Sequence, residues 1–378
     1  MSCIADLAAK VHAGERLTFD DGVRLLRHPN LPELAALADH VRQTKHPNSR
    51  VTYVIGRNVN YTNVCWVKCK FCAFYRAPGS SDGYVLPKEK IIEKIQELVE
   101  VGATLPGGDL PRSCEVLMQG GLNPKLKLDY YIDLLSSIKQ QFPQTHMHAL
   151  SAVEVIYLAH LSRLSWAETI KVLCAAGLDS IPGAGGEILN DDVRKAIAFR
   201  KDSTAEWLEL HETAHACGLN TTATMMYGSV DTLEHRLDHL LRVRESQERS
   251  QALANGAGRY TAFICWNFQP NQTPLGDELL AGGWHKSSGY EYLRTVAVAR
   301  LMLDNVDNVQ ASWVTQGAKI AQISLGYGVN DFGSLMMEEN VVSAAGTAFE
   351  MPLSEMHRLI RDAGYDPVRR NTGYELLN

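Results

Sequence analysis

Apolar residues are distributed along the chain in a repeating unit: a short run rich in β-branched and aromatic residues, a turn with Gly or Asn, and a longer segment with helical spacing. This alternation predicts parallel strands joined by helices. The runs that fit a strand are 58–62, 115–119, 145–149, 178–181, 221–226, 260–265, 308–313 and 329–332. Eight strands in one series indicate an α/β fold of the closed (β/α)8 barrel type.

The segments between these runs carry the spacing of amphipathic helices. The clearest covers 88–101, where Ile91, Ile95 and Leu98 share one face, and similar patterns occur at 131–142, 232–245 and 290–304. Two stretches rich in small and polar residues, 104–113 and 246–258, are predicted as surface loops. The expected organisation is a helical N-terminal cap over 1–50, a barrel over 51–345, and a C-terminal helical extension over 346–378 that packs on the barrel.

Composition narrows the class of protein. Hydrophobic residues make up 45% of the 378 residues, enough for a sizeable core, and 37 Lys and Arg against 43 Asp and Glu give a formal net charge of -6. This charge argues against a nonspecific nucleic-acid partner. The apolar runs are shorter than the ~20 residues that a membrane-spanning helix needs, so no membrane association is expected. Because the chain shows no signal peptide and no disulfide framework, we expect a cytoplasmic protein with reduced thiols.

Three closely spaced cysteines, Cys65, Cys69 and Cys72, are the strongest functional signal. Three thiolates on one loop can bind three irons of a [4Fe-4S] cluster and leave the fourth iron open to a small molecule. A structural zinc site is the alternative, but such sites usually combine two close pairs of ligands, and no second pair is present. The other cysteines are isolated and are expected to be small buried hydrophobes: Cys3, Cys114, Cys174, Cys217 and Cys265.

Unusual segments follow the first four predicted strands, so they should meet at the mouth of the barrel, where the sites of such barrels lie. They are the cysteine loop, Gly120 with Gly121, the segment that starts at Ser151, and the glycine-rich run before Glu187. Paired glycines let a backbone approach a ligand such as an amino acid, although they also serve simply to turn the chain. Glu187 is placed to accept hydrogen bonds from ribose hydroxyls; otherwise it is an ordinary acidic residue in the first turn of a helix.

The spacing Cys65-x-x-x-Cys69-x-x-Cys72 resembles the signature of the radical S-adenosylmethionine superfamily. Other segments resemble one branch of it, the cyclic dehypoxanthine futalosine synthase family of menaquinone biosynthesis: 60–63, 71–76, 119–124, 223–228, 310–317, 330–334 and 338–342. The likeness extends from about Tyr53 to the C terminus. Three segments depart from the family pattern, 104–113, 183–186 and 265–267, and none of them lies in the cysteine loop.

The resemblance implies a [4Fe-4S] cluster and S-adenosylmethionine as cofactors. It also implies reductive cleavage of S-adenosylmethionine to a 5′-deoxyadenosyl radical, which removes the C4′ hydrogen from the ribose of dehypoxanthine futalosine. The substrate radical then adds to the benzoate ring, and loss of an electron and a proton gives the spiro-cyclic product. The electron would come from a low-potential partner such as flavodoxin or ferredoxin. The cofactor supplies the bond-breaking power, and the protein positions the reactants.

Carried over residue by residue, the resemblance assigns roles in the site. Cluster ligation falls to Cys65, Cys69 and Cys72, contacts to the methionine part to Gly120 and Gly121, and contacts to adenosine or ribose to Tyr75, Ser151 and Glu187. Apart from the resemblance, the expected position of Asp331 at the mouth of the barrel leads to the hypothesis that Asp331 or a nearby polar group accepts the ring proton. Two related activities remain alternatives, aminofutalosine synthase and the tyrosine-using subunit of deazaflavin synthase. A non-enzymatic iron-sulfur or zinc-binding module is a more distant one.

Overall fold

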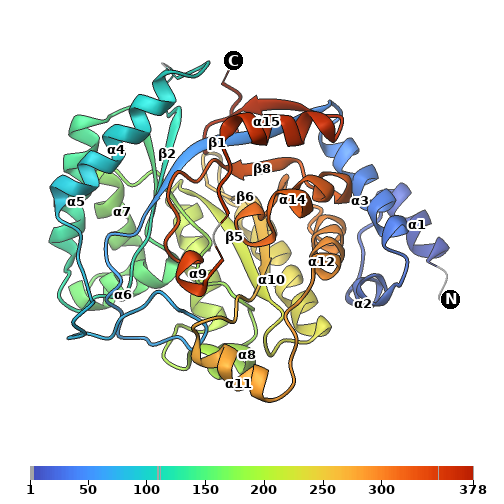
Figure 1. Ribbon diagram of the computed structural model, residues 1–378, viewed down its shortest axis with the longest axis horizontal. Helices are drawn as coiled ribbons and strands as arrows, with labels where there is room; N and C mark the ends of the chain where they lie inside the picture. Colours follow the sequence, from blue (N-terminus) through green and yellow to red (C-terminus); the bar gives the residue numbers. More distant parts are fainter. Residues whose placement is uncertain (1–3, 109, 111, 348, 378) are drawn as a thin grey trace.

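Eight parallel strands form a closed barrel in the computed structural model, which describes residues 4–108, 110, 112–347 and 349–377 (Figure 1). The strands run in chain order around the barrel, and β1 pairs with both β2 and β8, which closes the sheet. This confirms the predicted fold class. The barrel strands are β1 Arg50–Val59, β2 Cys114–Met118, β3 Thr145–Ala149, β4 Ser180–Ile181, β5 Asn220–Tyr227, β6 Tyr260–Asn267, β7 Asn308–Gln310 and β8 Asp331–Ser334.

The predicted strand positions hold in general, but three of them are shifted. The first strand begins at Arg50 rather than at 58, and most of its residues from Val51 to Val59 are buried, as is typical of a parallel strand covered on both faces. β7 ends at Gln310, since Trp313 already begins a helix, and β8 extends to Ser334.

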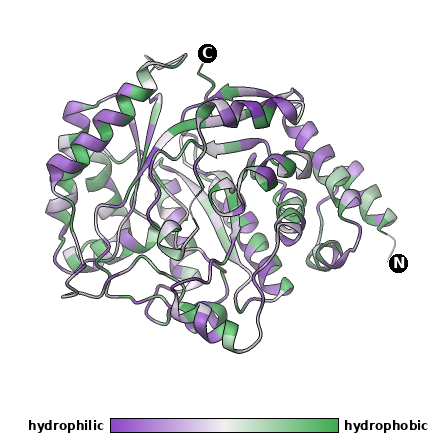
Figure 2. Ribbon diagram, in the orientation of Figure 1, coloured by the Kyte–Doolittle hydropathy of each residue, from purple (hydrophilic) through white to green (hydrophobic). Residues whose placement is uncertain are grey.

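Helices surround the barrel and connect its strands. They are α4 Lys88–Ala103, α5 Leu128–Gln141, α6 Ala152–Ser162, α7 Trp166–Ala176, α8 Asp191–Ala198, α9 Thr204–Ala216, α10 Leu233–Gln251, α11 Pro274–Ala281, α12 Gly289–Met302, α13 Trp313–Gln316 and α14 Ala318–Ser324, with short 3-10 turns η1 Leu325–Tyr327 and η2 Ser343–Ala345. The hydropathy colouring shows that single helices carry both hydrophilic and hydrophobic residues (Figure 2).

Of the two predicted surface loops, 104–113 and 246–258, the structure has the first as a loop and the second only in part. The passage 104–113 is a loop between α4 and β2, although residues 109 and 111 lie outside the described part of the chain. The predicted loop 246–258 is wrong over its first half, because α10 continues to Gln251. Three of its polar residues, Ser246, Gln247 and Ser250, are buried, and the amide of Gln247 donates to the Tyr260 carbonyl at 2.9 Å and accepts from the Tyr260 N–H at 2.8 Å.

The N-terminal helices α1 Ala5–His12, α2 Phe19–Arg27 and α3 Leu31–Lys45 pack on the outer side of the barrel. Here α2 contacts α10 and α12, whereas α3 contacts α12 and η1 (Figure 1). The C-terminal extension contains α15 Leu353–Asp362 and also a strand that was not predicted, β9 Asp366–Arg369, which pairs in parallel with the beginning of β1. Among the described residues, no helix is both long enough and apolar enough to cross a lipid bilayer.

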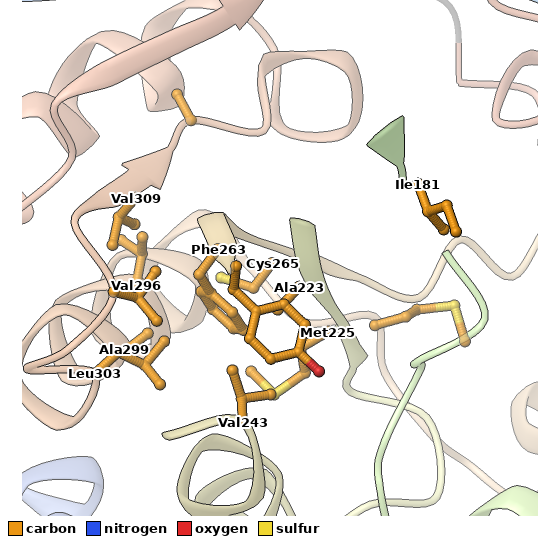
Figure 3. Close-up of a cluster of buried hydrophobic side chains, with 14 of the residues drawn as sticks. Ile181, Ala223, Met225, Val243, Phe263, Cys265, Val296, Ala299, Leu303 and Val309 are labelled. Carbon is orange, nitrogen blue, oxygen red and sulfur yellow. The ribbon is translucent and has the colours of Figure 1, made fainter. Parts of the chain in front are cut away.

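Alternation along the strands separates the hydrophobic core from the barrel interior. Ala223 and Met225 of β5, with Phe263 and Cys265 of β6, pack outward in a cluster with residues of α10 and α12, among them Val243 (Figure 3). Successive side chains of a strand point to opposite faces. The residues between them, Thr222, Thr224, Met226, Ile264 and Trp266, therefore point inward and line a cavity.

Candidate active site

The cysteine loop follows β1 at the mouth of the barrel, and its three thiols line one cavity of about 200 Å³. Backbone hydrogen bonds fix the loop: the Cys65 N–H donates to the Arg76 carbonyl at 2.8 Å, and the Lys70 N–H donates to the Ile197 carbonyl of α8 at 2.8 Å. Burial raises the pKa of the Cys69 thiol to about 12 and also raises that of Cys72. A thiol whose pKa is raised in this way is deprotonated readily only when it binds a metal, because the metal stabilises the thiolate.

The remaining cysteines lie elsewhere. Cys114 and Cys265 are buried, Cys174 and Cys217 are partly buried, and none of the four lines either of the two cavities described here. Cys3 lies outside the described residues. Within the described part of the chain, no three His, Cys, Asp or Glu side chains are arranged to hold a single metal ion. In a [4Fe-4S] cluster each thiolate binds a different iron, so its ligands need not converge on one point.

Gly120 and Gly121 pack directly against the cysteine loop and line the same cavity. A Cβ atom on Gly121 would lie 2.4 Å from the Val64 carbonyl oxygen and 2.9 Å from Cys65 Cβ, whereas one on Gly120 would lie 2.6 Å from the Tyr61 ring. The absence of a side chain is thus already required by protein packing. The turn is held by Glu154, whose carboxylate accepts the Gly120 N–H at 3.0 Å.

Glu187 lies between the thiols and the barrel interior and pairs with Lys201, which follows α8. Lys201 Nζ lies 2.6 Å from Glu187 Oε1, and both side chains are nearly buried. Burial lowers the pKa of Lys201, but Glu187 and Cys69 outweigh this effect, so its pKa lies above the ordinary value. The second oxygen, Glu187 Oε2, is buried without a hydrogen-bond partner in the described structure. An unpartnered buried acceptor at this place fits a hydroxyl of a ligand.

The two other predicted adenosine contacts, Tyr75 and Ser151, also line the thiol cavity. The Ser151 hydroxyl serves first as the N-cap of α6, because it accepts the Glu154 N–H and donates to the Glu154 carboxylate. The structure therefore brings eight of the nine predicted site residues to one cavity: Cys65, Cys69, Cys72, Tyr75, Gly120, Gly121, Ser151 and Glu187.

A second cavity of about 370 Å³ extends from the cysteine loop through the barrel interior. Phe71, Cys72, Gln119 and Glu187 line both cavities, so the two spaces adjoin. Its walls combine apolar side chains with amides and hydroxyls: Val54, Asn58, Leu117, Thr222, Thr224, Met226, Ile264, Trp266, Gln269, Gln310, Trp313, Thr315 and Ser334. Its far end is made by Glu115, His148, Arg370, Thr372 and Tyr374.

The ninth predicted residue, Asp331, does not line either cavity. It lies at the beginning of β8, is fully buried, and its two carboxylate oxygens accept from Arg370 Nε and Nη2 at 2.5 and 2.9 Å. The Thr52 hydroxyl and the Gly333 N–H donate to the same carboxylate. This geometry favours a role in holding Arg370 over direct contact with a substrate.

Sequence reasoning missed four residues of the site: Lys201, Glu115, Arg370 and Tyr374. Lys201 carries no local motif, and its role depends on the path of the chain after α8. Glu115 opens a predicted strand, and inward-facing residues at strand starts are usually core. Arg370 and Tyr374 are brought to the barrel only because β9 pairs with β1, and 346–378 was predicted as helical.

Comparison with known proteins agrees with this geometry. Residues 59–243 match the radical SAM superfamily, and residues 257–378 match the CofH/MqnC C-terminal region. The chain is 44% identical to the cyclic dehypoxanthine futalosine synthase of Halalkalibacterium halodurans, over 96% of this chain and 92% of the relative. It is 41% identical to the enzyme of the same name from Streptomyces coelicolor, over 99% and 88%.

The chain belongs to the CofH/MqnC branch of the radical SAM superfamily. A further relative in this branch is the 5-amino-6-(D-ribitylamino)uracil–L-tyrosine 4-hydroxyphenyl transferase 1 of Methanosarcina mazei, 40% identical over 98% of this chain and 93% of the relative. Among solved structures, methylornithine synthase shares the fold with a TM-score of 0.70 at 17% identity, over 96% of this chain and 97% of that chain.

The protein is therefore a radical SAM enzyme, and enzymes of this superfamily use a [4Fe-4S] cluster and S-adenosylmethionine. The residues present fit both groups. Three thiols on one cavity supply the ligands of a cluster with one open iron. The backbone of Gly120 and the unpartnered Glu187 Oε2 border the same cavity, where an amino acid and a ribose would lie.

Proposed function

We propose that this enzyme converts dehypoxanthine futalosine to cyclic dehypoxanthine futalosine in the futalosine route to menaquinone. The observation that carries the proposal is the adjoining pair of cavities: the thiol cavity opens on a long space inside the barrel through Cys72, Gln119 and Glu187. An elongated substrate with a ribose at one end and a benzoate at the other suits this space. Two relatives named cyclic dehypoxanthine futalosine synthase align with almost the whole chain.

The bound cluster and S-adenosylmethionine supply the radical that removes hydrogen. Cys65, Cys69 and Cys72 hold the cluster, and the Gly120–Gly121 backbone lies against the methionine part. Tyr75, Ser151 and Glu187 contact the adenosine. The inward residues of the barrel orient the substrate and exclude water, so that a reactive carbon centre meets only the benzoate ring. From the sequence, Asp331 or a nearby polar group is the expected acceptor of the ring proton.

The cluster also needs an electron from a partner, for which we propose a low-potential flavodoxin or ferredoxin. Lys68 supports this, because it is exposed on the cysteine loop beside the proposed ligands, where it can attract an acidic carrier, whereas the neighbouring Lys70 is paired with Glu278 at 2.9 Å. We place the enzyme in the cytoplasm, since a reducing compartment keeps the thiols free for the cluster.

The test is anaerobic reconstitution with iron and sulfide, followed by assays of 5′-deoxyadenosine and product mass. We expect turnover with dehypoxanthine futalosine. Turnover only with tyrosine and 5-amino-6-(D-ribitylamino)uracil would instead assign the activity of the Methanosarcina relative. Cys69→Ala should abolish cleavage of S-adenosylmethionine and leave a folded protein, whereas the matched variant Cys174→Ala, in a partly buried thiol away from both cavities, should keep it.

A further inference from the structure

The end of the barrel cavity that lies away from the thiols is built by the C-terminal segment. After β9, residues 370–374 turn in beneath the barrel, and Arg370 and Tyr374 reach the cavity. There they meet Glu115, the second residue of β2, and His148 of β3. Figure 1 shows the C terminus and α15 at the edge of the molecule opposite α8 and α11, which flank the cysteine loop.

Several hydrogen-bond donors at this end have no acceptor. The Tyr374 hydroxyl and Thr372 Oγ1 are buried without a hydrogen-bond partner in the described structure, although Thr372 lies close enough to Glu115 to lower its pKa. Arg370 donates to both Asp331 oxygens and to the Asn371 carbonyl. A guanidinium carries five N–H groups, so two of its N–H groups are left over. Buried polar groups of native proteins are almost always paired, and these groups face a cavity.

Among the described residues, the one cation at this end, Arg370, is already paired, so the spare donors, rather than a net charge, favour a ligand rich in acceptors. The Arg370–Asp331 ion pair is neutral overall, with side-chain exposures of only 3% and 0%. Burial raises the pKa of Glu115, an effect that Asp331 adds to and that Arg370 and Thr372 reduce. A planar group with several acceptor lone pairs and a negative charge would satisfy these donors, and a carboxylate has this chemistry.

We propose that Arg370, Thr372 and Tyr374, the floor subsite, bind the carboxylate of an aromatic acid substrate. This rests on the proposed function, whose substrate carries a benzoate. The floor subsite fixes the direction of the substrate: the benzoate carboxylate lies deep in the barrel, and the ribose lies at the other end, beside Cys72 and Glu187. The C-terminal segment is thus part of the substrate site and selects for acids of this length.

The experiment measures binding without turnover. Enzyme loaded with cluster and S-adenosylmethionine, but given no reductant, is titrated with dehypoxanthine futalosine and with its analogue in which phenyl replaces the benzoate. Wild type should prefer the carboxylate. Tyr374→Phe should weaken binding of the acid about ten- to a hundredfold, as expected for one hydrogen bond to a charged group, and leave binding of the phenyl analogue little changed. Thr372→Val is a second variant, should Tyr374→Phe fold poorly.

Tyr227→Phe is the matched control. Its hydroxyl is likewise buried and unpartnered, and an arginine, Arg236, lies over its ring at 4.6 Å as Arg370 lies over Tyr374 at 3.9 Å. Tyr227 lines neither cavity, so the affinity for both ligands should stay unchanged. Equal binding of both ligands by wild type, or equal losses for both in Tyr374→Phe, would overturn the floor subsite while turnover of the acid upholds the proposed function. Loaded wild type that neither binds nor converts the acid would overturn both.

Discussion

Glu154 accepts the backbone N–H of Gly120, with 3.0 Å between Oε1 and the nitrogen, although Gly120 lies in the loop after β2 and Glu154 in the first turn of α6. The same oxygen accepts the Tyr61 hydroxyl, and Oε2 accepts both the N–H and the hydroxyl of Ser151. One fully buried carboxylate therefore joins the loops after β1, β2 and β3. It sets the position of the glycine turn against the cysteine loop.

Glu154→Gln should disrupt this junction, because an amide NH₂ would replace one oxygen and face two donors. The free energy of unfolding should fall by about 1–3 kcal/mol for each donor that is left unsatisfied. S-adenosylmethionine should also bind more weakly, since the Gly120 backbone is displaced. Urea denaturation and equilibrium binding of S-adenosylmethionine measure the two effects.

Glu168→Gln is the matched control, because Ser165 and Glu168 form the same capping box at the start of α7, where it is exposed. It should cost no more than about 1 kcal/mol. Equal losses of stability in the two variants would mean that Glu154 acts only as a helix cap.

Gly121→Ala should reduce the iron content of the reconstituted enzyme. The new Cβ would lie 2.4 Å from the Val64 carbonyl oxygen, so the backbone next to Cys65 must move. Iron and sulfide analysis with the absorbance of the cluster gives the readout. Gly326→Ala serves as control, since a Cβ there meets nothing within 4 Å, and it should load normally. Full loading of Gly121→Ala would show that the loop adapts to the added methyl group.

Glu187→Gln should lower the affinity for S-adenosylmethionine about tenfold, through loss of a charged acceptor for a ribose hydroxyl. The substitution also leaves Lys201 buried without its charged partner. Removing one partner of a buried ion pair lowers the free energy of unfolding by about 3–5 kcal/mol. The double variant Glu187→Gln with Lys201→Met separates these effects. Its stability should recover while its affinity stays low; recovery of both would remove Glu187 from the ribose site.

The stability of the enzyme should fall as the pH drops from 7 to 5. Burial lowers the pKa of His148, His215 and His239 to about 3, and Arg370 and Arg194 add to this for His148 and His239. An unfolded histidine has a pKa of about 6.5, so between these values the unfolded state binds more protons, and each group costs roughly 2 kcal/mol at pH 5. Urea denaturation at both pH values measures this loss.

Replacement of one buried histidine tests the assignment. His239 Nδ1 accepts the Leu189 N–H at 3.0 Å, and His239→Gln keeps an acceptor at this place. In His239→Gln, the free energy of unfolding lost between pH 7 and pH 5 should be smaller than in wild type by the contribution of one histidine, roughly 2 kcal/mol. His160→Gln, at an exposed position of α6, should leave the loss as in wild type. Equal losses in both variants and wild type would refute the role of His239.

There is a physical reason why the sequence patterns predicted the barrel and most residues of the thiol cavity. Most strand residues are buried, and every residue predicted for the cofactors lies in a loop after a strand, where the fold itself brings it to the mouth. Cys65, Gly120 and Glu187 are examples. Such placement follows from topology alone.

The features that the sequence patterns did not predict depend on strand pairing between residues far apart in the chain. The segment around Val368 has only four residues in its strand and one partner, β1, so no local periodicity marks it. Without that pairing, Arg370 cannot be placed beneath the barrel, and Asp331 looks like a free acid near the mouth. The misplaced start of β8 has the same origin: a two-residue shift moves Asp331 from the rim to the bottom of the strand.

Asp331→Asn distinguishes the proton acceptor predicted from the sequence from the structural role that the geometry favours. The variant leaves Arg370 unpaired in a fully buried place, so we expect the free energy of unfolding to fall by about 3–5 kcal/mol. In the fraction that stays folded, and with saturating substrate, the ratio of 5′-deoxyadenosine to cyclic product should match wild type. A ratio that rises, with hydrogen removed but no product completed, would support the proton acceptor instead. Asp362→Asn, which removes an exposed partner of Arg358, should change stability by only about 0–1 kcal/mol and confirm that the large loss is due to burial.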